Sequence, residues 1–230
     1  MKKSTSASKL LHTLVVKPNI PPQASAIEEW SNAISMIVPS LVALWFIRQP
    51  EHNSELLPRI QCAGTMLHFP FSFLWHASSA ISRPQAILKR LDISFIHMSG
   101  VIISLSVSGS LLWTSVNLAW TFYSTFMLWT QTDGEMEGKQ KAARSQRIII
   151  TVVLYTLPVL YNGLTLVYMA SLSSFIISGT FYQVYPHGFG HTLFHVLMGI
   201  FQYFMINAAS LIEAQGKGSE LQFLDFLKQI

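Results

Sequence analysis

The chain has 230 residues, of which half are hydrophobic and only 11% are charged, and its formal net charge is +4. Soluble domains carry about a quarter charged residues, so this composition excludes an ordinary soluble protein and indicates a membrane protein. The basic residues form no patch with interleaved aromatic residues, and we therefore expect no nucleic-acid partner.

Seven mostly apolar segments follow one another along the chain, each close to the ~20 residues that a helix needs to cross a bilayer. They lie at 29–48, 59–80, 92–110, 111–131, 147–163, 164–184 and 189–212. The sequence therefore predicts an all-α membrane protein with a seven-transmembrane helix bundle over residues 28–212. Residues 1–27 contain no acid and are predicted to be a basic, disordered tail, and residues 213–230 a short C-terminal tail.

The basic residues predict how the bundle lies in the membrane. With the N-terminus in the cytoplasm, eleven Lys and Arg residues fall in cytoplasmic segments and four in segments on the other side. The positive-inside rule therefore predicts a cytoplasmic N-terminus and a C-terminus on the opposite side. This pattern is typical of a multi-pass protein of the plasma membrane or of an endomembrane.

Ionisable side chains inside the predicted spans are few, and each costs about 2.5–3.5 kcal/mol on insertion scales. His76 lies near the cytoplasmic end of the second span, one helical turn after Ser72. Asp92 begins the third span, and His191 and His195 occupy the first two turns of the seventh. With a cytoplasmic N-terminus, four of these side chains are expected at the same depth on the cytoplasmic side: His76, Asp92, His191 and His195.

Three neutral imidazoles and a water molecule are the usual ligands of an open zinc site, and a nearby carboxylate orients or deprotonates the water. The pattern therefore predicts Zn²⁺ bound to His76, His191 and His195. Asp92 and Ser72 are the candidate catalytic residues beside the ion.

A simpler interpretation is a cluster of interfacial side chains without a metal. The histidines would then reach toward the lipid headgroups, and Asp92 would pair with Lys89 or Arg90 at the start of its helix. Ser72 would bond back to a backbone carbonyl near the bend at Pro70. Three further histidines are expected to support the site or the fold: His68, His97 and His187.

Four short motifs, in this order, resemble those of the haemolysin III and progestin/adipoQ receptor family, whose superfamily includes the alkaline ceramidases. They are EEWSNAISM (28–36), SFLWH (72–76), KRLDISFI (89–96) and GHTLFHV (190–196). The resemblance implies a seven-helix bundle that binds zinc through His76, His191 and His195 near the cytoplasmic side. It also implies that Asp92 holds the zinc-bound water, with Ser72 beside it.

Members of this superfamily are described as ceramide hydrolases, as hormone receptors or as haemolysins. Two alternative functions are therefore considered for this chain. The first is a hydrolase of a ceramide-like lipid amide, with a membrane lipid as substrate and Asp92 as general base. The second is a receptor or haemolysin-like protein in which zinc is structural. A transporter with Asp92 and His97 as a proton relay is a weaker alternative, because no pair of broken helices marks corresponding halves of the chain.

Overall fold

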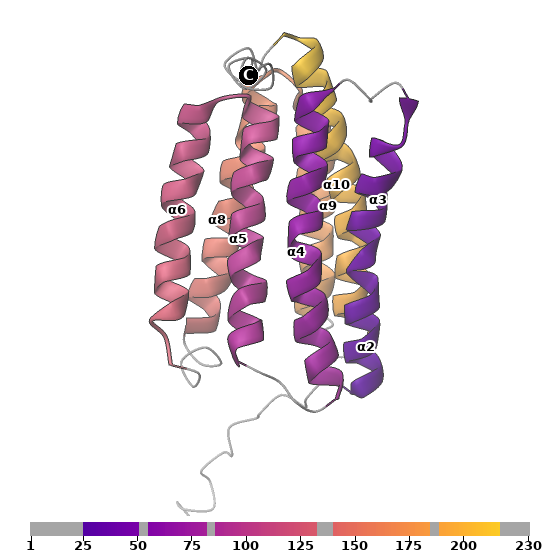
Figure 1. The fold of residues 1–230 in the computed structure, drawn as a ribbon, viewed down its shortest axis with the longest axis vertical. Coiled ribbons are helices and arrows are strands. Elements are labelled where there is room, and N and C mark those ends of the chain that lie inside the picture. Colours follow the sequence, from indigo (N-terminus) through magenta and orange to yellow (C-terminus); the bar gives the residue numbers. More distant parts are fainter. Residues whose placement is uncertain (1–24, 51–54, 82–85, 133–139, 185–188, 217–230) are drawn as a thin grey trace, which may run out of the picture.

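The structure is a computed structural model that describes residues 25–50, 55–81, 86–132, 140–184 and 189–216. Within these ranges the regular structure is entirely helical, and Figure 1 shows a bundle whose helices run roughly along one common axis. The helices are α2 (Ala26–Ser35), α3 (Ile37–Ile47), α4 (Leu56–Ala80), α5 (Ala86–Ser108), α6 (Leu111–Trp129), α8 (Gln140–Tyr161), α9 (Thr165–Val184) and α10 (Gly190–Ala214).

These helices coincide with the seven predicted segments, because α2 and α3 together cover the first of them. Within the described ranges, five segments are long and apolar enough to cross a membrane, which confirms an all-α, multi-pass membrane protein. They are Ala26–Ile47, Ala86–Ser108, Gln140–Tyr161, Thr165–Val184 and Gly190–Ala214. The helices α4 and α6 are not among these five; α4 buries the polar side chains of Gln61, Thr65 and Ser72, and α6 buries those of Asn117 and Thr121.

Only small parts of the two predicted tails can be compared with the structure. Residues 1–24 and 217–230 lie outside the described residues. The first helix begins at Ala26 behind the N-cap residue Ser25, close to the predicted boundary at residue 28, and α10 continues to Ala214, just beyond the predicted end of the last span.

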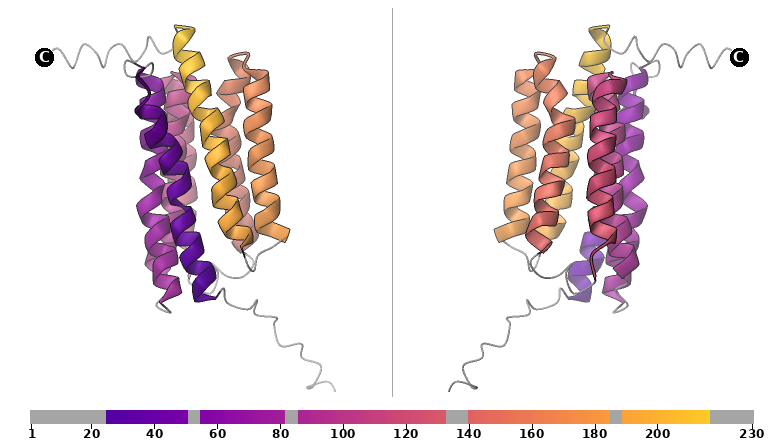
Figure 2. Two further views of the ribbon diagram at one scale, coloured as in Figure 1. Left: turned by 90° about the vertical axis from the view of Figure 1, so that its right-hand side faces the viewer. Right: turned by 90° about the vertical axis from the view of Figure 1, so that its left-hand side faces the viewer.

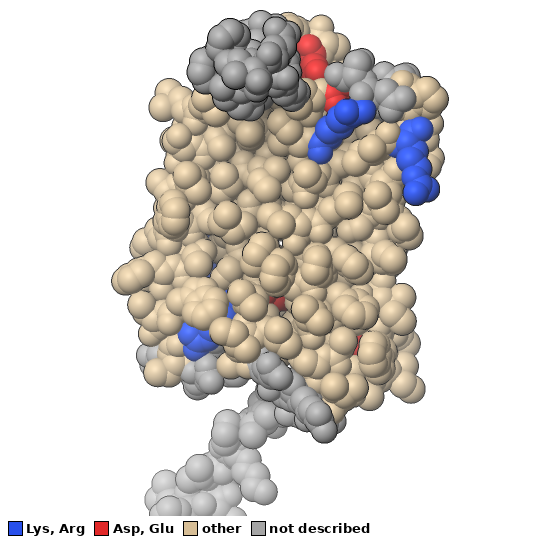
Figure 3. All heavy atoms as spheres, viewed as in Figure 1, with Lys and Arg blue, Asp and Glu red and all other residues tan. Residues whose placement is uncertain are grey.

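The outer surface of the bundle has the character expected of a lipid-facing protein. In Figure 3 the Lys, Arg, Asp and Glu side chains gather towards the two ends, and a broad belt of other residues lies between them. Large apolar side chains are exposed on this outer surface, among them Leu112 at 79%, Phe122 at 68% and Leu166 at 86%. A contiguous apolar surface of this extent is stable when it is covered by lipid rather than water.

A proline divides the first span into α2 and α3. Pro39 occupies the third position of α3, where it has no N–H to donate to the carbonyl of Ser35, and the helix is broken at Met36. The last turn of α2 is nevertheless buried, with Asn32 and Ser35 on its inner face. These two side chains therefore face the helices that carry the site.

Two polar contacts fix the register of α4 against α10. The Glu213 carboxylate accepts the backbone N–H groups of Leu56 and Leu57, at 2.9 and 2.7 Å, and so satisfies the first turn of α4. Further along the helices, the Gln61 side chain bonds to that of Gln202 at 3.1 Å. Because the two helices run in opposite directions, this register brings the end of α4 level with the start of α10, as Figure 1 shows.

The apolar core fills the half of the bundle away from those ends. Its buried members come from α4, α5, α8 and α10: Leu57, Ile103, Val107, Val152, Tyr155, Val159, Phe201, Met205, Ala208, Ala209 and Ile212. Figure 2 shows α10 beside α2 and α3 on one side and α9 on the other, so it lies at the centre of the contacts. The cavity described below begins in the other half of the bundle and reaches this core, since Ile103, Val152 and Tyr155 line it.

Candidate metal centre

Three histidines meet at one end of the bundle, His76 from the last turns of α4 and His191 and His195 from the first two turns of α10. One ligand atom from each lies within 4.8 Å of the others. The ring centroids of His191 and His195 are 4.5 Å apart, and those of His76 and His191 are 4.8 Å apart. The structure thus brings together the three side chains that the sequence predicted to converge.

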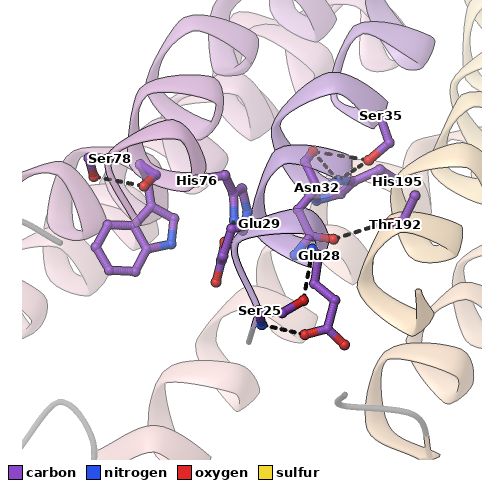
Figure 4. Close-up of polar contacts among 10 residues, drawn as sticks. Ser25, Glu28, Glu29, Asn32, Ser35, His76, Ser78, Thr192 and His195 are labelled. Atoms are coloured by element: carbon purple, nitrogen blue, oxygen red, sulfur yellow. Dashed lines mark hydrogen bonds and ion pairs between the residues drawn. The ribbon is translucent and has the colours of Figure 1, made fainter. Parts of the chain in front are cut away.

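An acidic residue of α2 holds the ring of His76. The Glu29 Oε2 atom lies 2.7 Å from Nδ1 of His76, and Figure 4 shows the two side chains facing each other between α2 and α4. An ionised carboxylate can only accept, so Nδ1 donates and the lone pair is left on Nε2. Metal-binding histidines commonly donate their other ring nitrogen to a carboxylate in this way.

The backbone of α2 holds the ring of His195 in a similar manner. Its Nδ1 lies 3.1 Å from the carbonyl oxygen of Asn32 and 2.9 Å from Oγ of Ser35. A carbonyl oxygen can only accept, so Nδ1 donates and Nε2 again keeps its lone pair. Thr192 donates to the Asn32 side chain at 2.8 Å, which ties the first turn of α10 to α2 (Figure 4).

The parts played by Glu29, Asn32 and Ser35 were not predicted, although all three lie in the EEWSNAISM motif. Their spacing of three residues places them along one face of α2. A polar stripe on an otherwise apolar helix is a signal that this face points into the protein. The sequence does not show which histidine each residue contacts.

The Asp92 carboxylate lies in the same cavity as the three histidines and pairs with His68. The distance from Oδ1 of Asp92 to Nε2 of His68 is 2.7 Å, so His68 donates to the carboxylate. Ser72 lies within hydrogen-bonding reach of the same carboxylate. Asp92 and Ser72 are therefore placed beside the histidines as the sequence predicted, and His68 supports Asp92.

The pairing of Asp92 with Lys89 or Arg90, expected from the simpler interpretation, is wrong. The Lys89 ammonium lies 5.4 Å from the centroid of the Trp75 ring. Arg90 donates to the carbonyl of Gln131 at 2.7 Å, near the end of α6. Both cations lie outside the cavity, whereas the Asp92 carboxylate points into it.

Two further histidines were expected to support the site or the fold. His97 is fully buried, and its Nδ1 lies 2.7 Å from the hydroxyl of Thr151, so it joins α5 to α8 away from the cluster. His187 lies outside the described residues.

A cavity extends from the histidine cluster into the bundle. With its mouth it encloses about 900 Å³ of empty space. Its end at the cluster is polar, and its walls are mainly apolar, with Ile103, Val152, Phe175 and Met198 from four different helices. Such a shape fits a ligand with a polar head and an apolar body.

The three histidines are chemically suited to a divalent transition metal such as zinc. Two of them present an unprotonated Nε2 because Nδ1 is engaged by α2. In a tetrahedral site with Zn–N bonds of about 2.0–2.1 Å, neighbouring nitrogens lie about 3.3 Å apart. The histidine nitrogens lie within 4.8 Å of one another, a separation that side-chain rotations can close.

No family model, curated protein or solved structure matches the chain.

Proposed function

We propose that the chain is a zinc-dependent hydrolase of a lipid amide that acts within the membrane. The observation that carries this proposal is the meeting of three histidines and the Asp92 carboxylate at the polar end of a deep, mainly apolar cavity. The four motifs that resemble the haemolysin III and adipoQ receptor family support the same assignment. The proposal includes seven spans and a cytoplasmic N-terminus, which together locate the site near the cytoplasmic face.

His76, His191 and His195 would hold the metal, with Glu29 and the carbonyl of Asn32 orienting two of the rings. Zinc, when bound, would supply a Lewis acid that polarises the amide carbonyl and lowers the pKa of a water molecule toward ~7. Three protein ligands leave one position open, which is typical of catalytic rather than structural zinc sites. That position would face the cavity.

Asp92 would act as the general base. It would take a proton from the attacking water as the new C–O bond forms, and return it to the amine nitrogen as the C–N bond breaks. His68 would keep the carboxylate in position through its 2.7 Å hydrogen bond. The Ser72 hydroxyl, buried beside Asp92, would donate to the oxygen of the reacting carbonyl.

The acyl chain of the substrate would occupy the apolar part of the cavity between α5, α8 and α10. Burial of an alkyl chain there contributes roughly 0.8 kcal/mol for each CH₂ group. Water would be largely excluded from this part of the site, which strengthens the electrostatic interactions at the reacting end. The fatty acid and the amine would leave as separate products.

A receptor or haemolysin-like protein with a structural metal is the second candidate. One observation favours it: the contacts of His76 and His195 connect α4, α10 and α2, so a metal there would hold three helices together. In that case the metal would stabilise the fold, and the Asp92–His68 pair would not take part in any reaction.

Metal removal distinguishes the two candidates. Purified protein in lipid nanodiscs is incubated with a ceramide-like N-acyl amide, and fatty acid release is measured by mass spectrometry. For a hydrolase, a chelator abolishes release and stoichiometric zinc restores it. For a structural site, the chelator lowers the thermal midpoint of unfolding and no fatty acid is released before or after treatment.

The Glu29→Gln variant is expected to bind zinc about 10- to 100-fold more weakly than the wild type, because an amide is a poorer acceptor for Nδ1 of His76. Affinity is measured by competition with a zinc-selective dye. The matched control is Glu28→Gln on the same helix turn. Glu28 closes a capping box with Ser25, a contact that glutamine also makes, so this variant retains wild-type affinity. Equal loss in both variants would contradict the role given to Glu29.

A further inference from the structure

A second set of polar side chains lies deeper in the cavity, beyond the histidines. Thr65 of α4, Ser99 of α5, Tyr155 of α8 and Gln202 of α10 all line it. They are at least nine-tenths buried, with exposed fractions of 5–7%. We call these four residues the inner polar ring.

The inner polar ring lies at one level of the bundle. Thr65 precedes Ser72 by seven residues in α4, Ser99 follows Asp92 by seven in α5, and Gln202 follows His195 by seven in α10. Seven residues are about two helical turns, so each pair lies on one face and about 10 Å apart along the axis. Since α4 runs opposite to α5 and α10, all three steps lead in the same direction, from the histidine cluster into the bundle (Figure 1).

Part of this ring is satisfied by the protein. The Gln202 Oε1 atom accepts from Nε2 of Gln61 at 3.1 Å and from the Thr65 hydroxyl at 2.9 Å. Gln61 accepts in turn from Ser106. These bonds engage the Oε1 atom of the Gln202 amide. Its Nε2 group remains available to the cavity that the residue lines.

The buried Ser99 hydroxyl has no hydrogen-bond partner among the described residues. Tyr155 and Gln202 line the cavity, and the bonds to Gln202 engage its Oε1 atom and not its Nε2 group. Water in the empty cavity can satisfy the polar groups that reach it, and rotation of the Ser99 side chain would bring its hydroxyl there as well. A plain alkyl chain that displaced this water would leave buried polar groups unpaired, which carries a free-energy cost. A ligand oxygen at this level would remove that cost.

We propose that the inner polar ring binds an oxygen function carried partway along the ligand's chain, about 10 Å from the group that lies at the histidines. The ligand is then a hydroxylated or otherwise oxygenated acyl chain rather than a plain hydrocarbon chain. A hydroxyl suits the ring because it donates and accepts, and both kinds of group are present. This inference rests on the proposed function only in taking the cavity as the place of an acyl chain.

Fatty acids test the proposal without any turnover, because they contain no amide bond. Binding to purified protein in nanodiscs is measured by native mass spectrometry for octadecanoic acid and for monohydroxyoctadecanoic acids with the hydroxyl at successive carbons. We expect affinity to peak for a mid-chain hydroxyl and to exceed that of octadecanoic acid by about tenfold, the equivalent of one hydrogen bond. Equal affinity for all of these acids, or no binding of any of them, would overturn the proposal.

The Ser99→Ala/Tyr155→Phe variant is expected to lose most of this tenfold preference while binding octadecanoic acid at least as well as the wild type. Both changes remove only a hydroxyl group; the Ser99 hydroxyl has no partner among the described residues, and Tyr155 lines the cavity. The matched control is Ser104→Ala, because Ser104 is a buried, unbonded serine of the same helix that does not line the cavity. This control keeps the full preference.

A preference that survives in the double variant, or that disappears equally in the Ser104→Ala control, would refute the assignment to the inner polar ring. The result is independent of catalysis. A protein that hydrolyses no amide can still show the preference, and a hydrolase can lack it, so the two proposals fail separately.

Discussion

Replacing His191 and His195 together with alanine is expected to reduce bound zinc from about one ion per chain, the content expected of the wild type, to almost none. The variant leaves His76 as a single ligand, and a lone imidazole does not retain the ion through purification. Zinc is measured by mass spectrometry of detergent-purified protein after size-exclusion chromatography, so that only folded, monodisperse material is compared.

His68→Gln is the matched control for this measurement. His68 lies in the same cavity and is a histidine of α4, but it falls outside the group of three ligand atoms and bonds to Asp92 instead. Glutamine can donate to the same carboxylate, and zinc content is expected to equal that of the wild type. If the double variant keeps its zinc, or if the wild type carries none, the histidines do not form a metal site.

The common depth of the three histidines could be predicted from the sequence, because it depends only on where each residue lies along its helix. A residue near the end of one membrane-length helix and a residue near the start of an antiparallel helix lie at the same level. His76 and His191 satisfy this condition whatever the rotation of their helices. Asp92, in the second turn of α5, is placed by the same argument.

The side-chain contacts around the site could not be predicted, because they depend on how each helix is rotated about its axis. The sequence alone allowed Asp92 to meet Lys89, Arg90 or a histidine, and the structure shows that it meets His68. Glu29 reaches His76 only because α2 packs against both α4 and α10, a neighbour relation that no local pattern encodes.

Helix ends were predicted least well at the starts of α5 and α8. The predicted spans began at residues 92 and 147, whereas the helices begin at Ala86 and Gln140. Both extensions carry charged residues, which a hydropathy pattern assigns to a loop. The structure buries Arg144 within the α8 extension and Arg147 at the predicted start of the span, so tertiary packing rather than apolar character determines where that helix begins.

Asp92→Asn is expected to lower lipid amide turnover by about 10²- to 10⁴-fold while zinc content stays at the wild-type level. Asparagine has the same shape and can still accept the hydrogen bond from His68, so the site keeps its geometry. It cannot take a proton from water at neutral pH. The loss should therefore appear in kcat more than in KM, since the base acts in the transition state and not in substrate binding.

Ser72→Ala and His68→Gln separate the base from the groups around it. Removing the Ser72 hydroxyl takes away one donor for the carbonyl oxygen and should cost up to about 10²–10³-fold in kcat, whereas His68→Gln keeps a donor to Asp92 and should cost less. If Asp92 transfers the proton, Asp92→Asn must lower kcat at least as much as either of the other two variants.

Turnover by Asp92→Asn within about tenfold of the wild type would remove Asp92 as general base. The histidine cluster would then be explained better by the structural metal that joins α2, α4 and α10.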